Sequence, residues 1–224
     1  MQLFRSILSR RMLALILCAV LIYVNAFTSV KVFAKVCTNQ PAFRCTANKQ
    51  AEADQAHNND LAITAKAAVL IDNASGRILY AKNKDKKLIP ASITKIMTLL
   101  LIFESIEQGK CKLEDKVTVS EYAASMGGSQ VFLEPGETQD VNTMIKCISI
   151  ASANDAAVAM AEHLAGSEQS FVKRMNKKAK ALGMKHTHFK NCNGLDDSIE
   201  SGHYSSAYDV ALMSQSLVSK YPDI

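Results

Sequence analysis

The sequence contains no tryptophan, and aromatic residues make up only 6% of its 224 residues. It has no internal repeat, which excludes a repeat architecture. No two of its six cysteines have the spacing of a metal-binding motif, and the chain is too long for a domain held together mainly by disulfides. Hydrophobic residues nevertheless make up 48% of the chain, so we expect one medium-sized domain with a buried core.

Acidic residues are absent from the first 34 positions, which hold three arginines and one lysine. The arginines precede the apolar run Met12–Val24, and small residues that suit a cleavage site follow at Ala26 and Ala34. This pattern predicts a cleaved signal peptide at residues 1–34, with a retained membrane anchor as the alternative. Without those residues the formal net charge falls from +5 to +1, so nucleic acid is not an expected partner.

Residues 35–60 are rich in Ala, Asn, Gln and Lys and poor in apolar residues. This composition predicts a flexible polar lead rather than part of the core. Cys37 and Cys45 lie in this lead, where export would permit a disulfide between them, whereas we expect free thiols elsewhere. The folded domain is then expected at residues 61–224.

Strand-like and helix-like segments follow one another through the domain. Two strand-like segments, 67–72 and 77–82, flank a turn that contains Gly76, and they predict a β-hairpin. A short third strand is expected at 116–119. The ranges expected to be helical are 93–108, 141–150, 155–164, 167–182 and 205–219.

Ser92 and Lys95 stand three residues apart in the stretch PASITKIMT, at the start of the first predicted helix. This spacing places the two side chains on one helical face, close enough to share a proton. A lysine activates a serine hydroxyl only where burial or nearby cations keep its amine neutral, so the motif implies an enclosed site. The Ser92 N–H, at the positive end of the helix, would favour a developing oxyanion. The same pattern also fits a serine helix cap followed by a surface lysine.

A second candidate motif, Ser152-Ala153-Asn154, lies between two predicted helices. A hydroxyl and a carboxamide two residues apart on a loop can point into one cleft, where one relays a proton and the other holds a substrate amide. A helix cap at Ser152 or Asn154 is the alternative.

Five stretches, in order, carry a resemblance to a known family: PASITKIMT, VFLEPGE, SANDAAVAMAEHLAG, NGLDD and GHYSSAYDVALM. Together they resemble the low-molecular-mass penicillin-binding proteins that act as D-alanyl-D-alanine carboxypeptidases, which combine Ser-x-x-Lys with a Ser-x-Asn triplet. The resemblance implies an α+β fold, in which a helical cluster packs against an antiparallel sheet. It also implies that the sheet's C-terminal strands are missing from this chain.

The resemblance further implies a role for each site residue. Ser92 would be the acylated nucleophile and Lys95 its base, while Ser152 would relay protons and Asn154 would bind the substrate backbone. The implied substrate is a peptidoglycan stem peptide ending in D-Ala-D-Ala, and β-lactam antibiotics would acylate the same serine. No metal and no cofactor are implied. The implied location is the outer face of the bacterial cytoplasmic membrane or the cell wall, with peripheral membrane association through a C-terminal segment.

The family's third motif, Lys-Thr-Gly, is absent from this sequence, so we expect the chain to be truncated. Without the second lysine and the cleft wall that carries it, the pKa of Lys95 is expected to return towards the ordinary value of about 10.4. The chain would then be weakly active or inactive.

Two other functions fit parts of the sequence. One is a class A β-lactamase, although Ala153 stands where that group usually has Asp. The other is a non-catalytic protein that binds the cell wall. The histidines do not have a ligand spacing on one helix, and we expect structural roles for His163, His186, His188 and His203.

Overall fold

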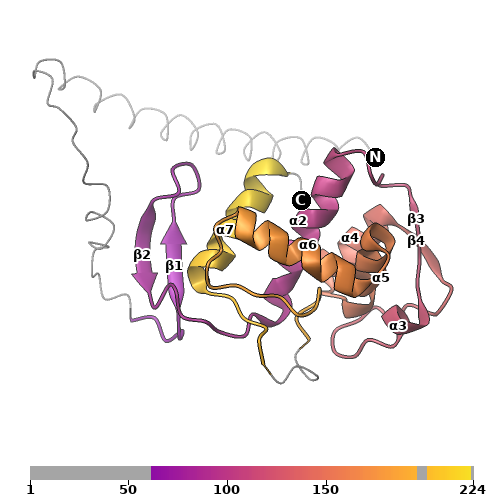
Figure 1. Ribbon diagram of the computed structural model, residues 1–224, viewed down its shortest axis with the longest axis horizontal. Coiled ribbons are helices and arrows are strands. Elements are labelled where there is room, and N and C mark those ends of the chain that lie inside the picture. The colour runs from indigo at the N-terminus through magenta and orange to yellow at the C-terminus, as the bar shows by residue number, and fades with distance from the viewer. Residues whose placement is uncertain (1–61, 196–200, 223–224) are drawn as a thin grey trace, which may run out of the picture. The chain divides into compact units, whose positions relative to one another are not determined.

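The computed structural model describes residues 62–195 and 201–222. The predicted signal peptide, the polar lead and the Cys37–Cys45 pair lie outside these residues. The described part combines two small antiparallel sheets with a set of helices, as the α+β prediction requires (Figure 1). None of the helices in the described residues is long and apolar enough to cross a bilayer.

The predicted hairpin is present as β1 (Ala68–Ile71) and β2 (Ile78–Lys82), which pair antiparallel with Val69 opposite Ala81. The turn is stabilised by Asp72, whose carboxylate accepts the backbone N–H groups of Ala74 and Ser75 at 3.3 Å each. Such a local side-chain contact explains why this link forms a turn.

The helix that carries the first motif is central to the described fold. It starts as a 3₁₀ turn, η1 (Ala91–Thr94), and continues as α2 (Lys95–Glu107). Met97, Leu100 and Ile102 are fully buried, because α2 packs against α4, α5, α6 and α7. The sequence predicted one helix over 93–108 and missed the tight first turn.

The remaining helices agree closely with the predicted ranges: α4 (Val141–Ile150), α5 (Asn154–Ala165), α6 (Glu168–Ala181) and α7 (Ala207–Lys220). Three of them start at a capping side chain, which accepts a backbone N–H of the first turn: Asp140 for α4, Ser167 for α6 and Ser206 for α7. In α5, every residue from Asn154 to Ala161 is buried, since small side chains let its neighbours approach closely.

A second small sheet was predicted only in part. The expected strand is β3 (Lys116–Thr118), and its partner β4 (Thr138–Asp140) was missed, as was the short helix α3 (Glu121–Ala124). β4 has the sequence TQD, which carries no strand signal of its own. It is a strand because it pairs with β3, whose Val117 is fully buried.

Candidate active site

Ser92 and Lys95 lie together at the start of α2. The Lys95 Nζ donates hydrogen bonds to Ser92 Oγ at 3.1 Å and to the backbone carbonyl of Asn193 at 2.8 Å. Ser92 is exposed, whereas Lys95 is only 3% exposed. Lys95 is therefore not a surface lysine. The solvent-exposed Ser92 hydroxyl contacts the amine of a buried lysine.

Burial changes the chemistry of that amine. It lowers the pKa of Lys95 to about 8, against a smaller opposing effect of Cys192. Burial also raises the pKa of the Cys192 thiol well above its ordinary value, so this neighbour stays neutral. The expectation that the pKa of Lys95 returns towards 10.4 is wrong, because the loop at Cys192 and Asn193 already shields the amine.

The alternative interpretation of Ser92 as a helix cap is also wrong. The residue that precedes η1 is Pro90 and the residue that precedes α2 is Thr94, and neither helix has a side-chain cap. Ala91, just before the serine, has a φ of 46°, a conformation that is costly for a residue with a Cβ. The backbone is thus held in a strained turn that presents Ser92, as is common at functional sites.

His203, about a hundred positions further along the chain, contacts the turn that carries Ser92. His203 is 5% exposed, and its Nδ1 accepts the N–H of Lys190 at 3.1 Å. A neutral ring therefore carries its proton on Nε2, which donates to Thr94 Oγ1 at 2.9 Å. His203 thus contacts the Ser-x-Thr-Lys turn through Thr94, which agrees with the structural role expected for it.

The second motif lies between α4 and α5. Ala153 precedes α5 and no side chain caps this helix, so the cap interpretation of Ser152 and Asn154 is wrong as well. Ser152 has a φ of 55°, again in the left-handed region. The Nδ2 of Asn154 donates to the Gly127 carbonyl at 2.7 Å, whereas its Oδ1 accepts no hydrogen bond within the described residues. The Asn154 carboxamide is thus held in place through its Nδ2, and its Oδ1 is available to accept a hydrogen bond.

The structure does not link the two motifs directly. Ser92 and Lys95 are joined by a hydrogen bond, but in the described residues neither bonds to Ser152 or Asn154. The roles of these four residues therefore stay predictions.

Asp155 supports the second motif, and the sequence analysis gave it no role. Its carboxylate is fully buried and accepts the N–H groups of Val131 and Leu133 at 3.1 Å each. It thereby ties the VFLEPGE stretch to the start of α5. The sequence did offer a signal for this role, because Asp155 directly follows the second motif and precedes the apolar run AAV. An acid buried in such a place needs hydrogen-bond donors around its carboxylate.

The loop after α6 makes the closest backbone approach to the first motif. Gly194 has a φ of 86°, and a Cβ added there would lie 1.8 Å from the carbonyl oxygen of Ala91. Only glycine fits this position. The neighbouring carbonyl of Cys192 accepts from Thr98 Oγ1 at 2.5 Å, so this loop contacts the first motif at several points.

The three cysteines that the structure describes are free thiols, as expected: Cys111, Cys147 and Cys192. Among the described residues, the one group of three side chains able to bind a metal lies elsewhere, at Cys111, Asp115 and His163.

Residues 50–224 match the model of the peptidase S11 family, described as D-alanyl-D-alanine carboxypeptidase. The chain belongs to this carboxypeptidase family. It is 58% identical to the D-alanyl-D-alanine carboxypeptidase DacF of Bacillus subtilis over 174 residues, which are 78% of this chain and 44% of DacF. The chain thus spans less than half of the length of that carboxypeptidase.

Solved structures of penicillin-binding proteins share the fold. Penicillin binding protein 5 from Haemophilus influenzae matches with a TM-score of 0.68 and 38% identity, over 72% of this chain and 47% of that one. Penicillin-binding protein D2 from Listeria monocytogenes, in its ampicillin-bound form, matches with a TM-score of 0.65 and 30% identity, over 73% and 65%. The predicted family and the predicted fold class are confirmed.

Proposed function

We propose that this chain carries the acylation site of a serine-type D-Ala-D-Ala carboxypeptidase. The observation that carries the proposal is the pair at the start of α2. Lys95 is 3% exposed, its amine lies 3.1 Å from the Ser92 hydroxyl, and burial lowers its pKa to about 8. Such an amine is neutral often enough near neutral pH to remove the proton of a serine.

The proposed reaction has two steps. Neutral Lys95 keeps one N–H on the Asn193 carbonyl and accepts the Ser92 proton on its lone pair, while Ser92 Oγ attacks the carbonyl carbon between the two terminal D-alanines. The proton then reaches the leaving amine through the Ser152 hydroxyl, the C–N bond breaks, and D-alanine departs. Water hydrolyses the resulting ester and restores the Ser92 hydroxyl.

Two further groups would position the substrate. The Oδ1 of Asn154 is available to accept a backbone N–H of the stem peptide. The backbone N–H of Ser92 donates to no carbonyl in the described residues, so it is available for the oxyanion of the tetrahedral intermediate. β-Lactams would enter the same site and acylate Ser92.

The substrate class and the N-terminal sequence support an exported location. Peptidoglycan lies outside the cytoplasmic membrane, and the predicted signal peptide would take the chain there. We extend the proposal to the outer face of that membrane or the cell wall, with peripheral association with the membrane.

The proposed activity is tested by D-alanine release from a stem pentapeptide that ends in D-Ala-D-Ala. Ser92→Ala should lower the release rate by at least about 10³-fold, because the nucleophile is gone. Ser105→Ala is the matched control, since Ser105 lies on the same helix and bonds only the Leu101 carbonyl. Equal rates in the parent and in Ser92→Ala would overturn the proposal.

A further inference from the structure

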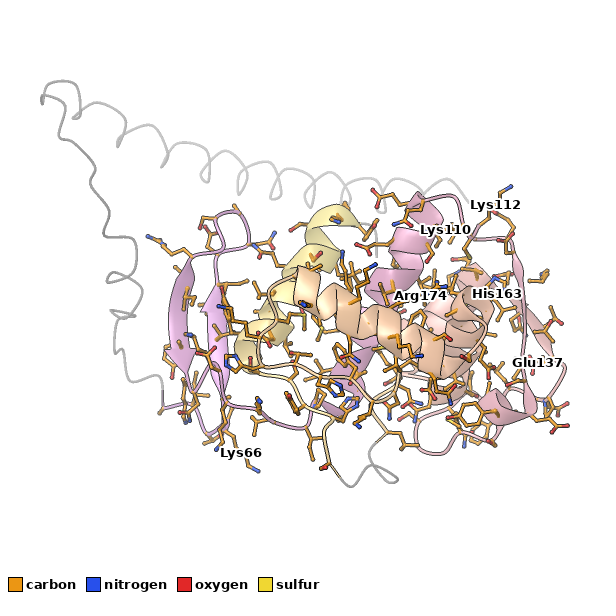
Figure 2. The ribbon with its side chains drawn as sticks, viewed as in Figure 1. Lys66, Lys110, Lys112, Glu137, His163 and Arg174 are labelled. Carbon is orange, nitrogen blue, oxygen red and sulfur yellow. The ribbon has the colours of Figure 1, made fainter. Side chains whose placement is uncertain are left out.

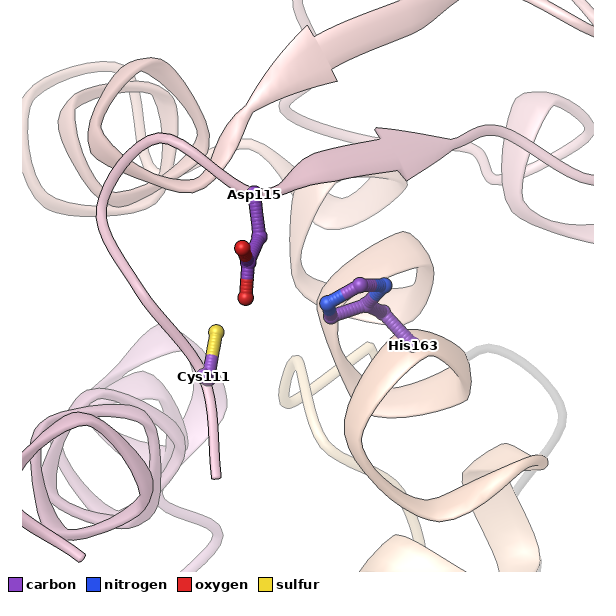
Figure 3. A group of neighbouring side chains, drawn as sticks. All are labelled: Cys111, Asp115 and His163. Carbon is purple, nitrogen blue, oxygen red and sulfur yellow. The ribbon is translucent and has the colours of Figure 1, made fainter. Parts of the chain in front are cut away.

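Three side chains far from Ser92 converge on one point. The Cys111 Sγ, a carboxylate oxygen of Asp115 and a ring nitrogen of His163 all lie within 4.8 Å of one another. Figure 3 shows the three groups turned towards a common space, two from the loop after α2 and one from α5. We propose that they bind a divalent zinc ion, which links the C-terminal ends of these two helices.

The donor set suits zinc. Thiolate sulfur, imidazole nitrogen and carboxylate oxygen are its three usual protein donors, at about 2.3, 2.0–2.1 and 2.0–2.2 Å. Tetrahedral bonds of those lengths place the donor atoms about 3.5 Å apart, so shifts on the order of 1 Å would close the present cluster around an ion. His163 is exposed and its ring has room to turn, and a water would fill the fourth position.

The charges around the cluster also suit a divalent cation. The Cys111 thiol and the Asp115 carboxylate are the two groups of the cluster that can supply negative charge to a cation. A bound zinc ion would displace the thiol proton, and the thiolate and carboxylate together would balance its two positive charges. The nearby lysines do not block the site: Lys110 Nζ bonds Gln108 Oε1 at 2.8 Å, and Lys112 extends outward (Figure 2).

The loop that carries two of the donors is already ordered. The backbone N–H of Lys112 donates to Asp115 Oδ2 at 2.8 Å, which fixes the carboxylate and leaves its second oxygen for a metal. The backbone carbonyl of Asp115 accepts a hydrogen bond from the backbone N–H of Val141 at 3.1 Å, which attaches the loop to the start of α4. Metal binding would therefore cost little conformational entropy, because these donors are already held in place.

The position of the cluster indicates a structural role. α2 begins at Lys95 and α5 begins at Asn154, so each helix carries its motif at one end and the cluster at or just beyond the other. Helices of 12 and 13 residues are about 18 Å long, so the metal would not touch the substrate. It would hold together the two helices that carry the motifs. The sequence gave no hint of it, because His163 is distant along the chain from Cys111 and Asp115.

Cobalt and zinc titrations of the untagged chain test the site. Cobalt bound by a thiolate gives a charge-transfer band in the near ultraviolet, and zinc should abolish that band by displacing cobalt. His163→Ala changes an exposed residue, so this variant should fold, and it should weaken zinc binding by at least about 100-fold. Cys111→Ser should remove the cobalt band.

Matched variants separate this site from other thiols and imidazoles. Cys147→Ser and His186→Ala change residues outside the cluster, and the double variant Cys37→Ser with Cys45→Ser removes the two cysteines of the polar lead at residues 35–60. All three should bind zinc as the parent does, and zinc should raise the melting temperature of each but not that of His163→Ala. Zinc binding that survives in His163→Ala, or a cobalt band that survives in Cys111→Ser, would overturn the proposal. So would the absence of zinc binding by the parent, and none of these results bears on acylation of Ser92.

Discussion

Lys95 is the residue on which the proposed chemistry depends. Its amine is surrounded by the Ser92 hydroxyl, the Asn193 carbonyl and the buried Cys192, so it loses most of its contact with water. Loss of hydration disfavours the charged form, which is why its pKa falls and the neutral base becomes available. The residues that shield Lys95 belong to the described part of the chain.

The pKa of Lys95 predicts the pH dependence of acylation. The deprotonated amine is the active form, so the acylation rate should rise with pH, reach half of its maximum near the pKa of about 8 and level off above it. Stopped-flow acylation by a penicillin, measured from about pH 6 to about pH 10, gives this profile. A rate that continues to climb towards the ordinary lysine value of about 10.4 would show that the amine is hydrated.

Ser152 combines a proposed role with a strained backbone, since its φ is 55°. Glycine adopts this conformation without strain, whereas alanine adopts it only at a cost, so Ser152→Gly should be more stable than Ser152→Ala by about 1 kcal/mol, the reverse of the usual order. Both variants lack the hydroxyl, so both should release D-alanine about 100-fold more slowly. Urea denaturation and the release assay measure the two effects. An alanine variant as stable as the glycine variant would argue against a left-handed Ser152.

At the scale of elements, the turn η1 and the loop after α6 form one unit. Gly194 allows the loop to approach Ala91, and Asn193 and Cys192 then supply carbonyl acceptors to Lys95 and Thr98. The arrangement of Ser92 and Lys95 therefore depends on a contact between segments about a hundred positions apart along the chain.

Gly194→Ala tests this contact. The added Cβ would meet the Ala91 carbonyl at 1.8 Å, so the loop must move away and expose Lys95. We expect acylation by penicillin to fall by at least about 100-fold, because small misplacements of reacting groups are costly. Gly183→Ala is the matched control, since its φ is also positive, at 76°, but nothing lies within 4 Å of the added Cβ. It should lose about 1 kcal/mol of stability and keep its acylation rate.

Local sequence signals account for much of the fold. Helix ranges were predicted because a helix start is specified by neighbouring residues, such as the capping Ser167 of α6. β4 was missed because it depends on pairing with β3, which a short polar segment does not encode. α3 was missed because it has only four residues, although Ser120 caps its start. The pairing of Ser92 with Lys95 was predictable from a three-residue spacing, whereas the contributions of Asn193, His203 and Asp155 come from distant segments.

At the scale of the whole molecule, the described residues already assemble the hydrogen-bonded pair of Ser92 and Lys95 and its support. Segments around Ser92, Asn193 and His203 meet at one end of α2, and the Ser152 segment begins α5, which packs against it. The sequence-based expectation of an inactive chain depended on a hydrated Lys95, and the structure instead buries this lysine. The account therefore predicts that the chain reacts with β-lactams.

The intact mass of the protein after incubation with a fluorescent penicillin tests this central claim most directly. The account predicts a single adduct on the 224-residue chain that is absent in Ser92→Ala and in Lys95→Met and is retained in Ser105→Ala. No adduct on the parent, or an adduct that persists in Ser92→Ala, would contradict the claim that Lys95 activates Ser92.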